Sequence, residues 1–300
     1  MTTQPIAASA DGIADPQRRV WAIAAVLAGM VLVVLDAAIA NIALPTIGTS
    51  LQVTPASAVQ VVTAYQLGLV MMLLPAAALG ESLGFRRVFA AGAALFTAAS
   101  VVCALSPSLT WLVVARFVQG IGGAGIMALG VALLRFVVPQ HRLGAAIGWN
   151  ALTVALSSAA GPTLGATILS LASWPWLFAV NLPIGVGVLI AARALPVVKG
   201  TGRPLDLASV VLSASTFALL VIGAEYAPSN PTLAIVLFVV AAAAGTMLVR
   251  REVGRVAPLI PLDLLSRSSF RVSVIASVLC FTGQAAGLVA LPFYLQHAFG

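Results

Sequence analysis

Charged residues are scarce in this chain: Asp, Glu, Lys and Arg make up 8% of its 300 residues, whereas hydrophobic residues make up 61%. The mean hydropathy is +1.10, and a soluble domain of this length could not keep its surface hydrated with so few charges. Cysteine is rare as well. Both copies, Cys103 and Cys280, lie inside apolar runs, which argues against a disulfide framework or a cysteine-rich metal site. The composition therefore predicts an integral membrane protein.

The sequence also lacks the residue groupings that catalysis and nucleotide binding require. Its two histidines, His141 and His297, lie in a predicted loop and at the far end of the last apolar run, so no metal set or His-centred triad is evident. No ATP-binding loop is present, so any energy would come from an ion gradient. The net charge of +7 does not indicate nucleic-acid binding, because the basic residues punctuate the ends of apolar runs instead of forming a patch. We expect no enzyme, no metal or other cofactor, no nucleic acid and no ATP.

Apolar runs long enough to cross a bilayer as helices, about 20 residues each, occur nine times. Two longer polar links, Val197–Pro204 and Arg250–Arg271, divide the chain into six spans, then two, then one. The predicted fold class is an all-α polytopic membrane protein. Its predicted spans are Val20–Pro45, Ala56–Leu79, Val88–Leu105, Trp111–Leu134, Leu143–Leu171, Trp176–Leu195, Leu207–Ala224, Thr232–Val249 and Val272–His297.

Basic residues mark one side of this predicted topology. Fourteen of the 15 Lys and Arg residues fall in the N-terminal tail or in loops on the same side, and the opposite loops have none. Because loops rich in Lys and Arg stay in the cytoplasm, we expect a cytoplasmic N-terminus in a multi-pass protein of the inner (plasma) membrane. The alternation also supports the number of spans, since one missed span would disrupt it.

Two opposite charges lie well inside the first six spans, Asp36 in the first and Arg116 in the fourth. Asp36 is 15 residues beyond Trp21, or about 22 Å from the cytoplasmic end, which leaves about 8 Å to the outer surface of the hydrocarbon core. Arg116 is five residues beyond Trp111, or about 7–8 Å from that same surface. Charges within spans are costly and usually paired or functional. The alternative is that each one meets water separately in a wide outer vestibule.

Small residues mark a predicted packing face on the fourth span. Arg116, Gln119 and Gly120 share one helix face, because they are three and four residues apart. Gly120 and the glycines that follow it permit close approach of a neighbouring backbone. The alternative, a merely glycine-rich packing face, explains the glycines but not the arginine.

The fifth span carries a second set of small residues. Gly161 and Gly165 are four residues apart, with Pro162 between them. Small residues allow close helix contact in lipid, so we expect other helices to hold this span on more than one side. A proline inside a helix bends or loosens it, which suits a hinge. An ordinary kinked membrane helix is the alternative.

Several segments, in order along the chain, together resemble the major facilitator superfamily, and within it the fourteen-span drug:proton antiporters. The loop after the second span departs from the family pattern, since Ala77, Glu81 and Ser82 stand where Gly, Asp and Arg are usual. The matching segments are LDAAIANIALP (Leu35–Pro45), LGESLGFRRVF (Leu79–Phe89), RFVQGIGGA (Arg116–Ala124), AAGPTLG (Ala159–Gly165), SWPWLFAVNLPIG (Ser173–Gly185) and LPFYLQ (Leu291–Gln296).

The resemblance implies a major facilitator fold, truncated in its second half. Expected parts are a cytoplasmic tail (1–19), a six-span N-terminal bundle (20–196), a cytoplasmic linker (197–206), two extra spans (207–249), a cytoplasmic loop (250–271) and the first span of an incomplete C-terminal bundle (272–300). In this fold the transport path lies between two bundles that rock about a central site. A 300-residue chain is therefore expected to be a fragment of a transporter.

The resemblance also implies roles for particular residues. Asp36 would exchange a proton and Arg116 would tune it, because burial disfavours a charged carboxylate and a nearby cation favours it. Drug-like hydrophobic or amphipathic substrates would bind between the bundles, and a cytoplasmic gate would close below them. The expected cavity residues are Tyr65, Gln66, Gln119, Trp149 and Asn150; the expected gate residues are Glu81, Gly84, Arg86 and Arg87; and the helix-packing residues are Gly120, Gly161, Pro162 and Gly165.

Other functions remain open from the sequence. One alternative is a transporter of a defined small hydrophilic solute, although the binding site for such a solute usually carries more polar groups than these spans contain. An inactive fragment with a binding or scaffold role is a further alternative. For Glu81 the plain alternative is a solvated loop charge beside two arginines. In each transport alternative the expected partners are a small-molecule substrate, protons and the lipid bilayer.

Overall fold

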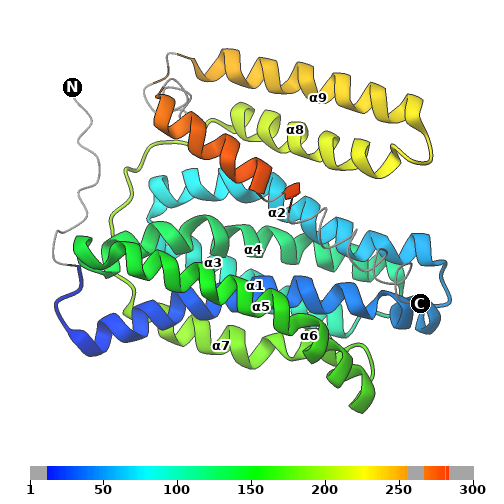
Figure 1. Ribbon diagram of the computed structural model, residues 1–300, viewed down its shortest axis with the longest axis horizontal. Helices are drawn as coiled ribbons and strands as arrows, with labels where there is room; N and C mark the ends of the chain where they lie inside the picture. The colour runs from blue at the N-terminus through cyan, green and yellow to red at the C-terminus, as the bar shows by residue number, and fades with distance from the viewer. Residues whose placement is uncertain (1–11, 254, 256–266, 281, 284–300) are drawn as a thin grey trace. The chain divides into compact units, whose positions relative to one another are not determined.

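The computed structural model describes residues 12–253, 255, 267–280 and 282–283, and the regular elements within these residues are helices (Figure 1). The chain divides into two compact units, Met1–Gly245 and Thr246–Gly300, and the first holds the site described below. The helices are α1 (Pro16–Ser50), α2 (Pro55–Leu83), α3 (Phe85–Ala104), α4 (Leu109–Val137), α5 (Leu143–Leu171), α6 (Trp176–Ala179), α7 (Asn181–Ala191), α8 (Leu207–Tyr226) and α9 (Pro231–Glu252), with 3-10 turns at Gln140–Arg142 and Ala192–Ala194.

Eight of the described helical segments are long and apolar enough to cross a membrane, which confirms the predicted all-α membrane fold class. They coincide with the first eight predicted spans, the sixth being built from α6, α7 and the turn that follows. α1 is longer than predicted and continues past Pro45, because its last turn is closed by the Leu51 N–H and the Ile47 carbonyl at 2.9 Å. The ninth predicted span is described only where it overlaps the helix Ser268–Cys280 and at residues 282–283, which are also helical; its other residues lie outside the described part of the chain.

The helix ends that carry basic residues meet at one end of the first unit. Arg18 at the start of α1 donates to the Ala194 carbonyl at 3.0 Å, and Arg86 at the start of α3 donates to the Leu195 carbonyl at 3.4 Å. The opposite ends meet as well, since the Trp174 indole donates to the Ser50 hydroxyl at 3.0 Å. The helices therefore alternate in direction, as the distribution of Lys and Arg requires.

The direction of this bundle in the membrane is a testable prediction. In a Cys280→Ser background, single cysteines at Ser108 and Ser229 should react with a membrane-impermeant maleimide in intact cells, because both lie at the end without Lys and Arg. A cysteine at His141, at the basic end, should react only after the cells are opened. Reaction at His141 in intact cells, together with silence at Ser108 and Ser229, would mean that the bundle is inverted.

α4 lies at the centre of the first six spans and packs closely against α2 and α3 (Figure 1). A Cβ added at Gly120 would overlap the carbonyl oxygen of Tyr65 on α2, and one at Gly122 would lie 2.5 Å from the backbone nitrogen of Phe96 on α3. Only glycine permits backbones to approach so closely. The glycines therefore hold the α4 face that carries Arg116 against both neighbours.

α5 packs mainly against α1, and its buried residues form one stripe: Asn150, Ser157, Gly161 and Gly165. A Cβ at Gly161 would overlap the Cβ of Ala38, whereas one at Gly148 would meet nothing within 4 Å among the described residues. In the described part of the chain, the contact is thus concentrated on one side, whereas the sequence predicts contact on several. The helix also continues through Pro162 without a break.

Gly161→Leu is expected to destabilise the intact protein by about 3 kcal/mol, because the added side chain has no room against Ala38 and overpacking forces the helices apart. The free energy of unfolding in detergent measures the effect. Gly148→Leu is the matched control on the same helix and should change stability little. Equal losses at both positions would show that contact between α1 and α5 is not the cause.

Candidate functional site: a buried charge network

An ion pair between Asp36 on α1 and Arg116 on α4 forms the centre of the site. Oδ2 of Asp36 accepts from Nη1 of Arg116, and the two side chains are 1% and 0% exposed. The two charges that the sequence places at the same depth are therefore in direct contact. The alternative in which each one meets water separately does not fit this burial.

Amide side chains from two further positions complete the carboxylate's hydrogen bonds. Oδ1 of Asp36 accepts from Nε2 of Gln119 at 3.0 Å and from Nδ2 of Asn181 at 2.6 Å. Gln119 also donates to the hydroxyl of Ser100 at 2.8 Å, and its oxygen accepts from Arg116 at 2.7 Å. The network thus joins α1, α3, α4 and α7, and hydrogen bonding of this kind is what makes burial of a charge tolerable.

The guanidinium of Arg116 makes its remaining contacts with α2 and α6. Its Nε donates to the carbonyl of Val61 at 3.3 Å, and its central carbon lies 4.2 Å from the ring centroid of Tyr65 and 5.5 Å from that of Phe178. Tyr65 is itself fixed, because its hydroxyl donates to the Val33 carbonyl at 3.1 Å. Cation–π contacts are strongest where water is absent. Nη2 of Arg116 is buried and has no hydrogen-bond partner among the described residues.

The contacts of this site are those expected for an ionised Asp36. Ionised Asp36 is matched by one cation and two amide donors, so the site is electrically and geometrically satisfied. A proton on Asp36 would neutralise the only carboxylate that contacts Arg116 among the described residues. A buried cation without its partner is costly, so the pair of charges is more stable than Arg116 would be alone. Among the described residues, no group of His, Cys, Asp and Glu could hold a metal ion.

The structure divides the five residues predicted to line a substrate cavity. Tyr65 and Gln119 are buried and belong to the charge network. Gln66 is exposed on α2, and on α5 Trp149 is 62% exposed while its neighbour Asn150 is buried. The oxygen of the Asn150 side chain has no partner among the described residues. The shared role of these five residues stays a prediction.

The predicted gate residues lie where α2 ends and α3 begins. Gly84 separates the two helices with a φ of +102°, a conformation that disfavours any side chain, and Arg86 and Arg87 occupy the first turn of α3. Among the described residues the carboxylate of Glu81 makes no ion pair. The contacts here are instead with the linker: the carbonyl of Glu81 accepts from the Thr201 N–H at 2.8 Å. The gate assignment stays a prediction.

Two members of the network, Ser100 and Asn181, are not identified by the sequence reasoning. Asn181 falls inside the matching segment Ser173–Gly185, and an amide in an otherwise apolar span was the available signal. Ser100 gives no such signal, because a serine in a membrane helix commonly bonds its own backbone, as Ser100 does to the Phe96 carbonyl at 2.8 Å. Its second role emerges only when α3, α4 and α7 are seen together.

Comparison with known proteins shows which family this sequence matches. The sequence pattern of the Major Facilitator Superfamily matches residues 26–300. A protein named uncharacterized transporter YebQ, from Escherichia coli (strain K12), is 44% identical over 296 residues, which cover 97% of this chain and 65% of that protein. Riboflavin transporter RibZ, from Clostridioides difficile (strain 630), is 30% identical over 272 residues, 90% of this chain and 59% of its own length. Putative multidrug resistance protein MdtD, from Salmonella typhi, is 34% identical over 211 residues, 70% of this chain and 45% of its own length.

The chain spans between 45% and 65% of the length of these relatives. The eight apolar helices within its described residues and its closely packed glycines agree with a membrane transport protein. The family pattern covers nearly the whole chain, including the helices that carry Asp36 and Arg116. The chain therefore belongs to the Major Facilitator Superfamily, whose members are membrane transporters and not enzymes.

Proposed function

We propose that the protein works as a proton-coupled antiporter that exports hydrophobic or amphipathic compounds, many of them cationic, from the cytoplasm. The observation that carries this proposal is the fully buried pair of Asp36 and Arg116. Proton uptake at Asp36 from outside would release Arg116 and favour one access state, and proton loss to the cytoplasm would restore the pair. Each cycle would thereby link a proton entering the cell to a substrate leaving it.

The surroundings of the pair support an antiporter whose substrates are hydrophobic or amphipathic. The carboxylate lies among amide and aromatic side chains, and two apolar clusters of the bundle flank it. Gln66 on α2 and Trp149 on α5 are exposed and would contact substrate in the intact protein. An aromatic ring and a few polar groups in an apolar surface suit large, weakly hydrated compounds.

A transporter of one defined hydrophilic solute is the second candidate, and one relative favours it. The Clostridioides difficile protein that is 30% identical over 90% of this chain is named a riboflavin transporter, whereas the Salmonella typhi relative is named a putative multidrug resistance protein. The two candidates share the proton-coupling step at Asp36. They differ in the substrates they would transport, and one assay can compare these substrates directly.

The test uses the intact protein in proteoliposomes with an imposed pH gradient. We expect the gradient to drive movement of ethidium, a lipophilic cation, and expect a protonophore to stop that movement. Movement of riboflavin without ethidium would favour the second candidate. Transport of ethidium or riboflavin that is indifferent to the protonophore would contradict proton coupling for either substrate class.

A further inference from the structure

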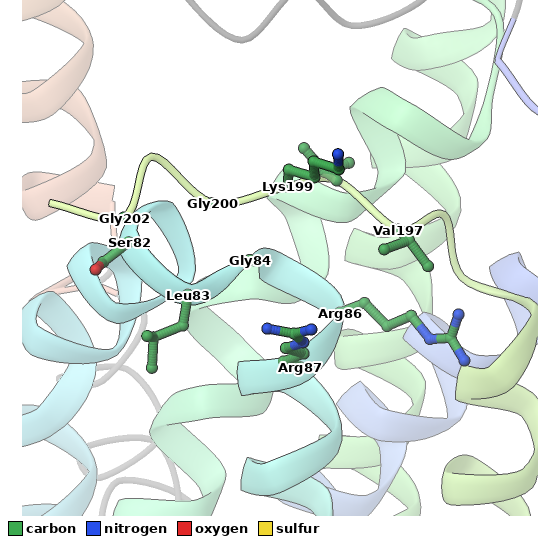
Figure 2. Close-up of a pocket in the computed structure, with 10 residues that line it drawn as sticks. Ser82, Leu83, Gly84, Arg86, Arg87, Val197, Lys199, Gly200 and Gly202 are labelled. Atoms are coloured by element: carbon green, nitrogen blue, oxygen red, sulfur yellow. The ribbon is translucent and has the colours of Figure 1, made fainter.

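A cavity of about 690 Å³ lies at the basic end of the first unit, beneath the linker that joins α7 to α8 (Figure 2). The linker crosses over the turn between α2 and α3 and is held there by two hydrogen bonds: the Gly202 N–H donates to the Ser82 carbonyl at 3.0 Å, and the Ser82 hydroxyl donates to the Arg203 carbonyl at 2.6 Å. We call this space the linker cavity. It is lined by Ser82, Leu83, Gly84, Arg86, Arg87, Val197, Val198, Lys199, Gly200 and Gly202.

The lining of the linker cavity carries three cations and no carboxylate. Figure 2 shows Arg86 extending away toward the end of α7, where it donates to the Leu195 carbonyl. Arg87 and Lys199 come from separate segments and, within the described residues, the side chain of neither makes a hydrogen bond or an ion pair. Two free cations at the edge of one cavity, with no acidic residue among its lining, create a local excess of positive charge.

The start of α3 adds to this excess. The first helical hydrogen bond is made by the Val88 N–H to the Gly84 carbonyl, so the helix offers no partner to the three N–H groups before it. No side chain caps this end, and its first turn contains no acidic residue. Two arginines in a first turn oppose the helix dipole, which favours negative charge there. A bound anion would offset both unfavourable terms.

We propose that the linker cavity binds a phosphate group, supplied by an anionic phospholipid or by a free phosphate ester. Arg87 and Lys199 would hold the phosphate oxygens from two sides, near the uncapped start of α3. Leu83 and Val197 are 52% and 67% exposed at the same cavity, so apolar surface adjoins the cations. That combination matches the headgroup and glycerol region of a phospholipid better than a small soluble ester. The site is separate from the charge network and does not depend on the proposed transport function.

The test titrates the lipid-depleted intact protein in detergent with three probes and follows binding by calorimetry. The probes are short-chain phosphatidylglycerol, short-chain phosphatidylcholine and glycerol phosphate. We expect phosphatidylglycerol to bind more tightly than phosphatidylcholine. The double variant Arg87→Gln/Lys199→Gln should weaken phosphatidylglycerol binding about thirtyfold, since each basic residue near an anionic lipid contributes about fivefold. Both side chains are exposed, so the double variant should fold normally.

Two further variants make the result specific. Arg142→Gln removes one positive charge at the same end of the unit, outside the lining of the linker cavity, and should leave binding unchanged. Val197→Asp adds a negative charge at the cavity wall and should weaken binding. Glycerol phosphate that binds as tightly as phosphatidylglycerol, and is weakened equally by the double variant, would identify a free phosphate ester as the ligand. Equal phosphatidylglycerol affinity in wild type and double variant would overturn the proposal, and so would equal affinity for the two lipids.

Discussion

Asp36→Asn is expected to abolish proton-driven efflux by the intact protein. Asparagine has nearly the same size as aspartate and keeps an oxygen for the donors Gln119 and Asn181, but it cannot bind and release a proton. Substrate binding should survive, because the shape of the surroundings hardly changes. Efflux of a transported probe, measured in proteoliposomes with an imposed pH gradient, gives the result.

The matched control for this variant is Glu225→Gln, which removes a carboxylate at the exposed end of α8 and should leave efflux intact. Arg116 loses its countercharge in Asp36→Asn, so the folded fraction of the variant must be measured beside its transport. Gln119, Val61 and two aromatic rings still hold the guanidinium, which should keep the protein folded. Efflux at the wild-type rate would remove Asp36 from the mechanism.

Arg116→Ala is expected to lower the free energy of unfolding by about 3–5 kcal/mol. The change removes one partner of a buried ion pair and leaves Asp36, whose side chain is 1% exposed, without a cation. It also creates a cavity beside Tyr65 and removes a cation–π contact at 4.2 Å. Chemical denaturation of the detergent-solubilised intact protein measures the loss.

Two comparisons separate the charge effect from the lost volume. The double variant Asp36→Asn/Arg116→Ala leaves no unpaired charge, so it should recover part of the stability that Arg116→Ala loses. Arg135→Ala removes an exposed arginine at the end of α4 and should change stability by about 0.5 kcal/mol or less. If the double variant is no more stable than Arg116→Ala, the carboxylate left alone is not the source of the loss.

The helices of this fold could be predicted well from the sequence, because the bilayer sets their length. Span five is predicted at the residues where α5 begins and ends, and the pattern of Lys and Arg predicts the alternation that the contacts of Arg18 and Arg86 show. The end of α1 is the boundary that the sequence predicts least accurately. The sequence predicts that the first span ends at Pro45, but a proline removes only one hydrogen bond, and the helix continues to Ser50.

The candidate site could be predicted in part, since charges are rare enough inside the spans for two of them to stand out. Depth along each helix placed Asp36 and Arg116 at one level, and helix spacing placed Gln119 beside the arginine. Sequence cannot give rotation about the helix axis, however, so it does not predict that Tyr65 is buried while Gln66 and Trp149 are exposed. It also missed Asn181, whose bond to Asp36 joins residues 145 positions apart.

Proton release on substrate binding tests the central claim, that Asp36 carries the transported proton, most directly. The intact protein in weakly buffered detergent is mixed with a probe that it transports, and a pH indicator reports the protons released. Wild type should release protons as the probe binds, whereas Asp36→Asn should bind the probe without releasing them. The same proton release from both proteins would contradict the claim.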